Sequence, residues 1–554
     1  MSERVLPPGT TYEEVCARFR WSVPAAFNIG VDICDRHAGD PARLALIYED
    51  DAGRVTEYTF AELRARSNQL AHALRRLGVG FGDRVGVVLS QRPELAVFHL
   101  ATYKLGAVVL PLATLFGPEA LEYRLRDAGV RVAVTDGETL ERLLGVRQAY
   151  PGLTHVIGVD GADADGALDY RRLIATQSDH FDPVATAGED PALLIYTSGT
   201  TGPPKGALHA HRMLIGRLPS MEMVHEHMPQ PRDRFWTPAD WAWAGGLLDM
   251  LLPAWHYGIP VLAHRFRKFD AERAFDLMAR HRVRNVFLPA TVLKMMRRVD
   301  DPRSRWPVDL RTIHSGGESL GAEMIAWSRD ALGCTPNEGF GQTEATLVIG
   351  NCSALMPVRP GSMGRPVPGH TIALVDADGR PVPTGDVGEI AVKRPDPVMF
   401  LRYCNNEQAT RDKFAGDWLL TGDLGTQDAD GYLWYAGRKD DVMSCGAYRI
   451  GPGEIEACLT GHAAVAVAAA VGSPDPIRGE VVKAFVQLRD GIAATPTLAH
   501  ELQEYVRARL SAHEYPREIE FIDIVPTTFN GKVKRKELRE LERQRKLGTA
   551  SAGD

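Results

Sequence analysis

The chain has 554 residues, more than one hydrophobic core usually supports, so we expect two or more domains. Its 44% hydrophobic and 24% charged residues are typical of an ordinary soluble globular protein. A formal net charge of -7 argues against nucleic acid or an anionic membrane as the main partner, and favours a small molecule.

The cysteines and the apolar stretches indicate the cellular compartment of the protein and whether it spans a membrane. Seven cysteines are scattered and none is spaced C-x-x-C, which argues against a disulfide framework or a structural zinc site. The N-terminus, MSERVLPPGTTYEEV, lacks the apolar core of a signal peptide, and the longest apolar stretch, residues 247–263, is interrupted by Asp249, Pro253 and His256. We therefore expect a cytoplasmic protein with reduced thiols and no membrane span.

In chain order, the first half alternates between predicted strands and helices. Thr59 and Glu62 have the spacing of a capping box, and apolar residues recur near the helical period after them. This alternation predicts a mainly parallel α/β fold. The strands are expected at residues 84–89, 107–112, 130–135, 193–195, 261–262 and 285–288, and further helices at 94–105 and 271–281.

The pattern of the amino-acid sequence changes after residue 361. Short segments broken by Gly, Pro and Asp predict hairpins of a β-rich subdomain up to residue 431. From residue 437 the pattern predicts a small, separate α+β unit. Its helices are expected at residues 454–459 and 497–510 and its strands at 465–471 and 482–488.

The strongest chemical signal is the stretch YTSGTTGPPKG, residues 196–206, which follows a strand-like apolar run. Its glycines allow a tight turn that brings N–H groups to an anion, and its hydroxyl groups and Lys205 add donors and positive charge. The glycine spacing does not match a Walker loop. A phosphate loop of another kind is the favoured interpretation, and a flexible polar surface loop is the alternative.

Further polar clusters follow. The stretch EGFGQTE, residues 338–344, suits a loop that touches a nucleotide, and Glu344 beside Thr343 is a candidate magnesium ligand, with a capped helix start as the alternative. The glycines of HSGGESLG, residues 314–321, allow a flat base or an acyl chain to approach the backbone. Asp423 is either a turn former or an acceptor for ribose hydroxyls.

Six motifs and their order resemble the adenylate-forming enzymes, the superfamily of acyl-CoA synthetases, luciferases and peptide-synthetase adenylation domains. The motifs are, in chain order, YTSGTTGPPKG, EGFGQTE, TGDLG, GRKDD, GAYRIGPGEIE and NGKVKR. Medium-chain acyl-CoA synthetases are most similar in look. The resemblance implies an α/β fold with a large N-terminal AMP-binding domain of several sheets, residues 1–437, which includes the β-rich subdomain. It also implies a small mobile α+β lid, residues 438–554, with a hinge near Asp440.

The implied activity is an ATP-dependent carboxylic acid:CoA ligase that uses ATP, magnesium and coenzyme A. The acid, expected to be medium-chain, branched or aromatic, first becomes an acyl-adenylate and then a thioester. The resemblance implies that Lys532, Thr343 and Glu344 are catalytic residues and that Glu344 is the metal ligand. The other implied contacts are Thr197, Ser198, Gly199, Thr200, Thr201, Gly202 and Lys205 for the β- and γ-phosphates; Gly316, Gly317, Glu318, Glu338, Gly339, Phe340, Gly341, Gln342 and Thr343 for adenine and the α-phosphate; Asp423 and Arg438 for ribose; and Gly446, Ala447, Tyr448 and Arg449 for the thiol tunnel.

The acyl pocket is expected along residues 236–246, with Trp241, Trp243, Gly245, Gly246 and also Gly341 in its wall. Acetate-specific relatives look to have tryptophan where Gly341 stands, which predicts a deeper pocket here; the tryptophans are alternatively core residues.

One departure concerns the thiol tunnel, where the family's S-G-x-R is replaced by Gly446-Ala447-Tyr448-Arg449. If Ala447 blocks coenzyme A, the chain is instead an adenylase that passes its acyl group to a carrier protein or another acceptor. A catalytically silent nucleotide-binding regulator is the remaining alternative. The sequence around Lys532 resembles a site at which some bacterial relatives are acetylated, so a lysine acetyltransferase and a deacylase are further predicted partners.

Overall fold

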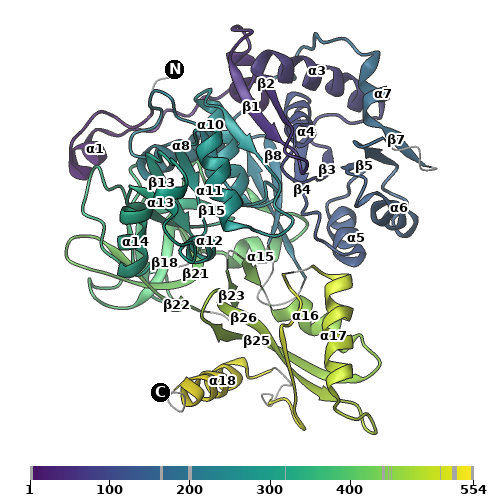
Figure 1. The fold of residues 1–554 in the computed structure, drawn as a ribbon, viewed down its shortest axis with the longest axis vertical. Helices are drawn as coiled ribbons and strands as arrows, with labels where there is room; N and C mark the ends of the chain where they lie inside the picture. The colour runs from purple at the N-terminus through teal and green to yellow at the C-terminus, as the bar shows by residue number, and fades with distance from the viewer. Residues whose placement is uncertain are drawn as a thin grey trace. The chain divides into compact units, whose positions relative to one another are not determined.

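The structure is a computed structural model, and its descriptions cover residues 4–161, 166–197, 203–317, 320–439, 443–446, 448–450, 452–511, 513–526 and 533–550. The chain divides into two compact units (Figure 1). Unit 1 comprises Met1–Thr114, Leu125–Ile195 and Gly206–Gly437, and unit 2 comprises Leu115–Arg124, Tyr196–Lys205 and Arg438–Asp554.

One sheet has eight strands in the order β19-β9-β8-β4-β3-β5-β6-β7. The pairs β3–β4, β3–β5, β5–β6 and β6–β7 are parallel, as the alternation of strands and helices predicts. The strands are β3 (Arg84–Val88), β4 (Val108–Pro111), β5 (Val132–Thr135), β6 (His155–Gly158), β7 (Ala167–Asp169), β8 (Pro191–Thr197), β9 (Lys205–Ala210) and β19 (Arg402–Tyr403).

A second sheet has fourteen strands and changes character along its length. The pairs from β1 through β11, β10, β12 and β13 to β14 are parallel, whereas those from β14 to β16 and β16–β22 are antiparallel. The strands of the predicted β-rich subdomain therefore continue this sheet, except β19, which belongs to the eight-stranded sheet. The strands of the fourteen-stranded sheet are β1 (Leu44–Glu49), β2 (Val55–Thr59), β10 (Phe235–Trp236), β11 (Val261–Ala263), β12 (Asn285–Phe287), β13 (Thr312–Gly316), β14 (Pro336–Gln342), β15 (Ala345–Gly350), β16 (Ser362–Pro366), β17 (Ile372–Val375), β18 (Gly388–Lys393), β20 (Phe414–Ala415), β21 (Trp418–Gln427) and β22 (Leu433–Arg438).

Two helices of unit 1 are buried: α8 (Met213–Val224) along its whole length, and α4 (Pro93–Lys104) at every residue except Glu94. A helix that is covered on all sides lies inside a core. Both contribute to one hydrophobic cluster that also takes Val85 and Val109 from the smaller sheet and Leu46 and Val261 from the larger one. The cluster therefore lies between the two sheets, with these helices inside it.

The opposite face of the larger sheet has its own helices. Successive strand residues point to opposite faces, so Ile47 and Leu262, next to Leu46 and Val261, belong to another cluster with α11 (Ala271–Arg280) and α14 (Ala322–Leu332) (Figure 1).

The other helices of the first 437 residues begin and end as follows: α1 (Tyr12–Arg18), α2 (Ile29–Ile33), α3 (Phe60–Arg76), α5 (Pro118–Asp127), α6 (Leu140–Ala149), α7 (Tyr170–Ala175), α9 (Ala244–Gly246), α10 (Leu252–His256), α12 (Ala290–Met296), α13 (Pro302–Arg305) and α15 (Glu407–Asp412), with a 3-10 turn η1 (Asp35–His37) and a π-helical turn η2 (Leu247–Leu251). The predicted capping box is confirmed, because Thr59 and Glu62 exchange hydrogen bonds at the start of α3. Among the described residues, no helix has the length and hydropathy needed to cross a bilayer.

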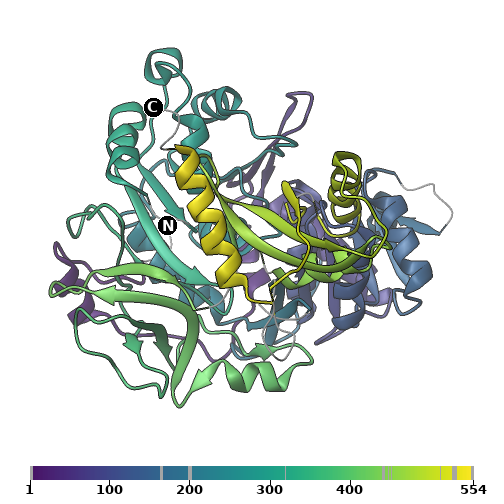
Figure 2. The ribbon, with the colours of Figure 1, turned by 90° about the horizontal axis from the view of Figure 1, so that it is seen from below.

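Unit 2 contains a five-stranded sheet with helices on both faces. Ala468 and Ala470 pack with α16 and α17, whereas Ala469 and Val471 pack with Leu538 of α18. Figure 2 shows the yellow helix α18 lying along this sheet. The elements are β23 (Met443–Cys445), β24 (Tyr448–Ile450), β25 (Val465–Asp475), β26 (Gly479–Leu488), β27 (Glu518–Phe521), α16 (Pro452–Thr460), α17 (Pro496–Arg509) and α18 (Arg535–Ala550).

Candidate active site

The phosphate-loop motif joins two neighbouring strands of the smaller sheet. Thr197 ends β8 and Lys205 begins β9, and the Thr197 hydroxyl donates to the Lys205 carbonyl at 3.4 Å. The structure thus places both ends of the predicted loop together. Its central residues Ser198, Gly199, Thr200, Thr201 and Gly202 lie outside the described residues.

The glycines of two further motifs lie side by side on parallel strands. Gly316 at the end of β13 is in register with Gly339 of β14, and a Cβ atom added to Gly316 would be 3.0 Å from the Gly339 carbonyl oxygen. Gly317 follows with a φ of +91°, a conformation that favours glycine. Glu318 lies outside the described residues.

Glu338 fixes the segment that follows β13 and Gly317. Its carboxylate is buried and Oε1 accepts a 2.7 Å hydrogen bond from the backbone N–H of Leu320. The side chain thus fastens the chain after β13 to β14. Phe340, two residues further along β14, is half-buried against the cluster under the antiparallel part of the sheet.

Gln342 and Asp423 come from different motifs and are in direct contact. Nε2 of Gln342 donates to Oδ2 of Asp423 and, at 2.7 Å, to the carbonyl oxygen of Thr421. Tyr435 donates its hydroxyl to the other carboxylate oxygen of Asp423 at 3.4 Å. The structure therefore joins the predicted adenine segment to the predicted ribose-binding carboxylate.

Glu344 occupies the turn between β14 and β15 and is buried. Its Oε1 accepts a hydrogen bond from the Tyr403 hydroxyl, and its carbonyl oxygen accepts one from Phe400 N–H at 2.8 Å. Burial alone would raise the pKa of this carboxyl, but the charge of Lys413 and the Tyr403 hydrogen bond outweigh burial and hold the pKa below the ordinary glutamate value. Glu344 is therefore an ionised carboxylate in a buried place.

An ionised carboxylate oxygen is a hard ligand of the kind that Mg²⁺ prefers, so Glu344 fits the predicted metal. Within the described part of the chain, no group of three or more His, Cys, Asp or Glu side chains is arranged to hold a metal ion. One carboxylate together with substrate phosphate oxygens is a common arrangement for Mg²⁺.

Three side chains around Glu344 were missed by the sequence analysis. Tyr403 comes from β19, Lys413 follows α15, and His209 comes from β9. Lys413 Nζ also donates to the Gln342 side-chain oxygen at 3.4 Å, and burial lowers the pKa of His209 to about 4, so its ring is neutral at pH 7. Only His209, four residues after Lys205, lay close enough to a motif for the sequence to suggest it.

Gly341 has a structural reason to be glycine. A Cβ atom there would be 2.0 Å from the backbone nitrogen of Leu347, a residue of β15 whose own φ is +44°. The close approach of β14 and β15 requires glycine, whatever the depth of the acyl pocket.

The residues of the expected acyl pocket follow β10. Trp241 is fully buried in the cluster between the sheets, whereas Trp243 is half-buried. Added Cβ atoms would lie 2.8 Å from the Phe287 ring at Gly245 and 2.3 Å from the Asp240 carbonyl oxygen at Gly246. These glycines let the start of α9 pack closely against the end of β12 and the preceding loop.

In unit 2, the hairpin of β23 and β24 carries the predicted thiol-tunnel residues. Gly446 has a φ of +65° and donates its N–H to the Arg478 carbonyl at 2.9 Å, and the Tyr448 ring stacks on His513 at 4.0 Å. The turn itself therefore favours glycine at Gly446. Ala447, Asp440, Lys532 and the side chains of Arg438 and Arg449 lie outside the described residues.

Comparisons with known proteins agree with this arrangement. Residues 34–404 match the model of the AMP-binding enzyme family, and residues 454–532 match that of the AMP-binding enzyme C-terminal domain. The chain belongs to the AMP-binding enzyme family.

Similar proteins indicate which kind of AMP-binding enzyme the chain is. Acetyl-coenzyme A synthetase of Bacillus subtilis is 33% identical over 96% of this chain and 95% of its own length, and the human mitochondrial acyl-coenzyme A synthetase ACSM4 is 32% identical over 96% and 93%. The crystal structure of the anthranilate CoA ligase AuaEII in complex with anthranoyl-AMP is 30% identical, with a TM-score of 0.71 over 95% of this chain and 99% of that one. The protein is an adenylate-forming acyl-CoA synthetase, an AMP-forming acid–thiol ligase that uses ATP and coenzyme A.

Proposed function

We propose that the protein activates a medium-chain, branched or aromatic carboxylic acid, with Glu344 holding a magnesium ion beside the nucleotide. The observation that carries the proposal is the contact of Gln342 with Asp423. Gln342 lies two residues before the ionised Glu344. This contact supports the proposal because it brings Asp423, the carboxylate we assign to ribose, against the short segment that ends in Glu344, the carboxylate we assign to magnesium.

In the first half-reaction, an oxygen of the substrate carboxylate attacks the α-phosphorus of ATP and the bond to pyrophosphate breaks. Thr197, Lys205 and the glycine-rich segment between them would bind the β- and γ-phosphates through N–H groups and positive charge. Asp423 and Arg438 would accept and donate hydrogen bonds at the ribose, and residues 316–318 and 338–343 would enclose adenine and the α-phosphate. Bound magnesium would neutralise charge on the phosphate oxygens.

Two anions must approach one another in this step, so a cation close to both is needed. We assign this role to Lys532, with Thr343 hydrogen bonding to the phosphate. In the second half-reaction the thiol of coenzyme A attacks the acyl carbon and AMP leaves, with residues 446–449 beside the thiol. A hinge at Asp440 between residues 1–437 and 438–554 would exchange the two arrangements.

The substrate class rests on the residues after β10. The half-buried Trp243 gives this stretch apolar surface and the two glycines allow close packing, while Trp241 supports the stretch from the core; this suits a substrate larger and less polar than acetate. The name of AuaEII as an anthranilate CoA ligase supports an aromatic acid in this framework.

The test is acid-dependent exchange of labelled pyrophosphate into ATP with a panel of short, medium-chain, branched and aromatic acids. Exchange with the medium-chain, branched or aromatic acids is expected, together with acyl-CoA on adding coenzyme A. Lys532→Ala should abolish exchange and keep ATP binding. An acyl-adenylate that persists in the presence of coenzyme A would favour transfer to another acceptor, and no exchange with any acid would favour a silent nucleotide-binding regulator.

Two finer predictions accompany this function. All seven cysteines are free thiols, which suits the predicted cytoplasmic location. Acetylation of Lys532 would remove its charge and stop adenylation, so treatment with a lysine deacylase should raise the activity of protein isolated from its native host.

A further inference from the structure

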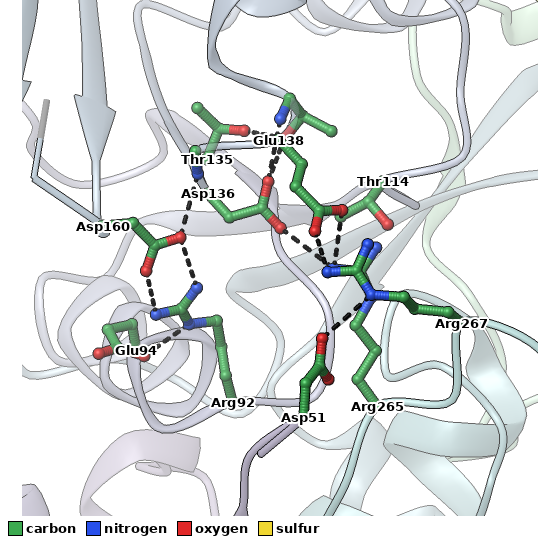
Figure 3. A network of polar contacts seen from close by, with 12 residues as sticks. Asp51, Arg92, Glu94, Thr114, Thr135, Asp136, Glu138, Asp160, Arg265 and Arg267 are labelled. Carbon is green, nitrogen blue, oxygen red and sulfur yellow. Dashed lines mark hydrogen bonds and ion pairs between the residues drawn. The ribbon is translucent and has the colours of Figure 1, made fainter.

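Polar side chains connect the two sheets of unit 1 at the carboxyl ends of their parallel strands. In α/β proteins this is the edge at which ligands bind. Figure 3 shows Arg92, after β3, between Glu94 and Asp160, and Arg265, after β11, facing Glu138. These ion pairs hold the strand ends of the smaller sheet and β11 of the larger one in a fixed arrangement.

Gln91, the neighbour of Arg92, makes a different connection. Its side chain is buried, and Nε2 donates to the carbonyl oxygens of Thr237 at 3.0 Å and Ala239 at 2.5 Å. Its Oε1 accepts from the backbone N–H of His264 at 3.3 Å. One amide from the smaller sheet is thus bound to the chain after β10 and to the chain after β11.

The chain after β10, residues 237–243, is here called the tryptophan loop because it carries Trp241 and Trp243. Its far side is held by Thr237, whose hydroxyl donates to the Phe287 carbonyl at 2.7 Å and accepts the Ala239 N–H at 3.1 Å. Its end is closed by the Trp243 N–H, which donates to the Asp240 carbonyl at 3.2 Å. The loop is therefore held between Gln91, which bonds its backbone, and β12, which Thr237 reaches through its hydroxyl, and Trp243 is its half-buried apolar side chain.

We propose that Gln91 is a specificity-determining residue of the acyl pocket, which acts by fixing the position of the tryptophan loop. The inference rests on the proposed function, in which this loop forms the wall that meets the acid. Gln91 is a positioning residue, because its amide is used entirely on backbone groups of the protein. One methylene more or less on a substrate in an apolar pocket changes discrimination roughly 10- to 200-fold, so a small change in the shape of the pocket is measurable.

Gln91→Met is the decisive variant, since it keeps the length and volume of the side chain and removes all three hydrogen bonds. The buried carbonyl oxygen of Thr237 and the half-buried one of Ala239 would then lack this donor, and the loop has to move or admit water to satisfy them. We expect the ratio of kcat/KM values for an aromatic and a linear acid of similar size to change about fivefold or more. The KM for ATP should remain unchanged.

Arg92→Met is the matched control, because Arg92 extends from the same turn but binds Glu94 and Asp160 instead of the tryptophan loop. It should lower the melting temperature and leave the ranking of acids as in the wild type. Thr237→Val removes the other fastening of the loop and should alter the ranking as well, which keeps the inference testable if Gln91→Met does not fold.

The outcomes separate this inference from the proposed function. If the wild type shows no acid-dependent pyrophosphate exchange, the proposed function fails. If the wild type activates acids and folded Gln91→Met and Thr237→Val rank them as the wild type does, the inference alone is overturned. A ranking that changes equally in Arg92→Met would also overturn it, because general loosening of the sheets would then explain the effect.

Discussion

The hydroxyl of Tyr403 donates a hydrogen bond to Oε1 of Glu344, and the two residues are only 5% and 7% exposed. In the pairing of β19 with β9, Tyr403 lies opposite Ala207, two residues after Lys205. The strand that leaves the phosphate loop and the carboxylate assigned to magnesium are therefore connected through one tyrosine.

Tyr403→Phe should weaken the use of magnesium, because partners that orient a ligating carboxylate are typically worth 10- to 100-fold in metal affinity or activity. The measurement is the Mg²⁺ concentration for half-maximal pyrophosphate exchange, together with binding of Mn²⁺ and ATP followed by the paramagnetic signal of the metal. Tyr432→Phe is the control, since that hydroxyl donates to the Pro357 carbonyl. An unchanged metal dependence in Tyr403→Phe would mean that Tyr403 only supports packing.

Gly341→Ala should destabilise the protein, because the new methyl group would meet the Leu347 backbone, which cannot move as a flexible side chain would. Overpacking of this kind costs about 1–3 kcal/mol, and more where backbone is displaced. Gly321→Ala is matched to it, since a Cβ there meets nothing within 4 Å and its φ is -74°. Urea unfolding of both variants gives the comparison, and equal stability of the two would contradict the role assigned to Gly341.

Glu222→Gln should change how stability depends on pH. The carboxylate of Glu222 accepts the backbone N–H groups of Val5 and Leu6 and the Tyr257 hydroxyl, yet burial outweighs these bonds and raises its pKa to about 7. The folded state then binds more protons than the unfolded state, so this group's contribution to stability is lost as pH rises from about 4.5 to about 7.

The wild type should therefore lose stability relative to Glu222→Gln between pH 5 and pH 8, by up to roughly 3 kcal/mol for a shift of this size. Thermal unfolding of both proteins across this range measures the difference. Parallel pH profiles would show that the carboxyl titrates as it does in the unfolded chain.

Lys205→Ala should raise the KM for ATP roughly 10- to 100-fold, the usual range for losing one charge-assisted hydrogen bond. The order of preference among acids should not change, because in the proposed function the phosphate loop binds ATP and the tryptophan loop meets the acid. Kinetics with three acids of different shape provide the test, and a reordered preference would give the loop a wider role.

The sequence predicted the local features of the fold well. The capping box of α3 depends on residues three apart, and the phosphate-loop motif is contiguous, so both are readable along the chain. The division of the strands between two sheets was not predicted, since each short apolar run fits either sheet equally well. The burial of α4 and α8 between the sheets follows from that division.

The site was predicted where motifs supply whole segments, and missed where single side chains arrive from a distance. Tyr403 is 59 residues from Glu344, and the contact of Gln342 with Asp423 spans 81 residues. The first contact joins β19 of the eight-stranded sheet to the turn after β14 of the fourteen-stranded one, and the second joins β14 to β21 within the larger sheet. No short sequence pattern encodes either relationship. Gln91 was missed for the same reason, because a buried glutamine between sheets looks like any polar residue at the end of a strand.

In unit 2, the chain on either side of residues 527–533 is tied to the body of the unit. Lys534 N–H donates to the Pro526 carbonyl at 2.9 Å, Val525 N–H donates to the Gln487 side chain at 3.1 Å, and Arg535 pairs with Glu456 at 2.5 Å. A fluorophore on the exposed Arg543 position of α18 would therefore travel with the attachment points of the Lys532 segment. Under the hinge motion proposed at Asp440, a second dye in unit 1 would turn catalytic cycling into an optical signal without altering the lysine itself.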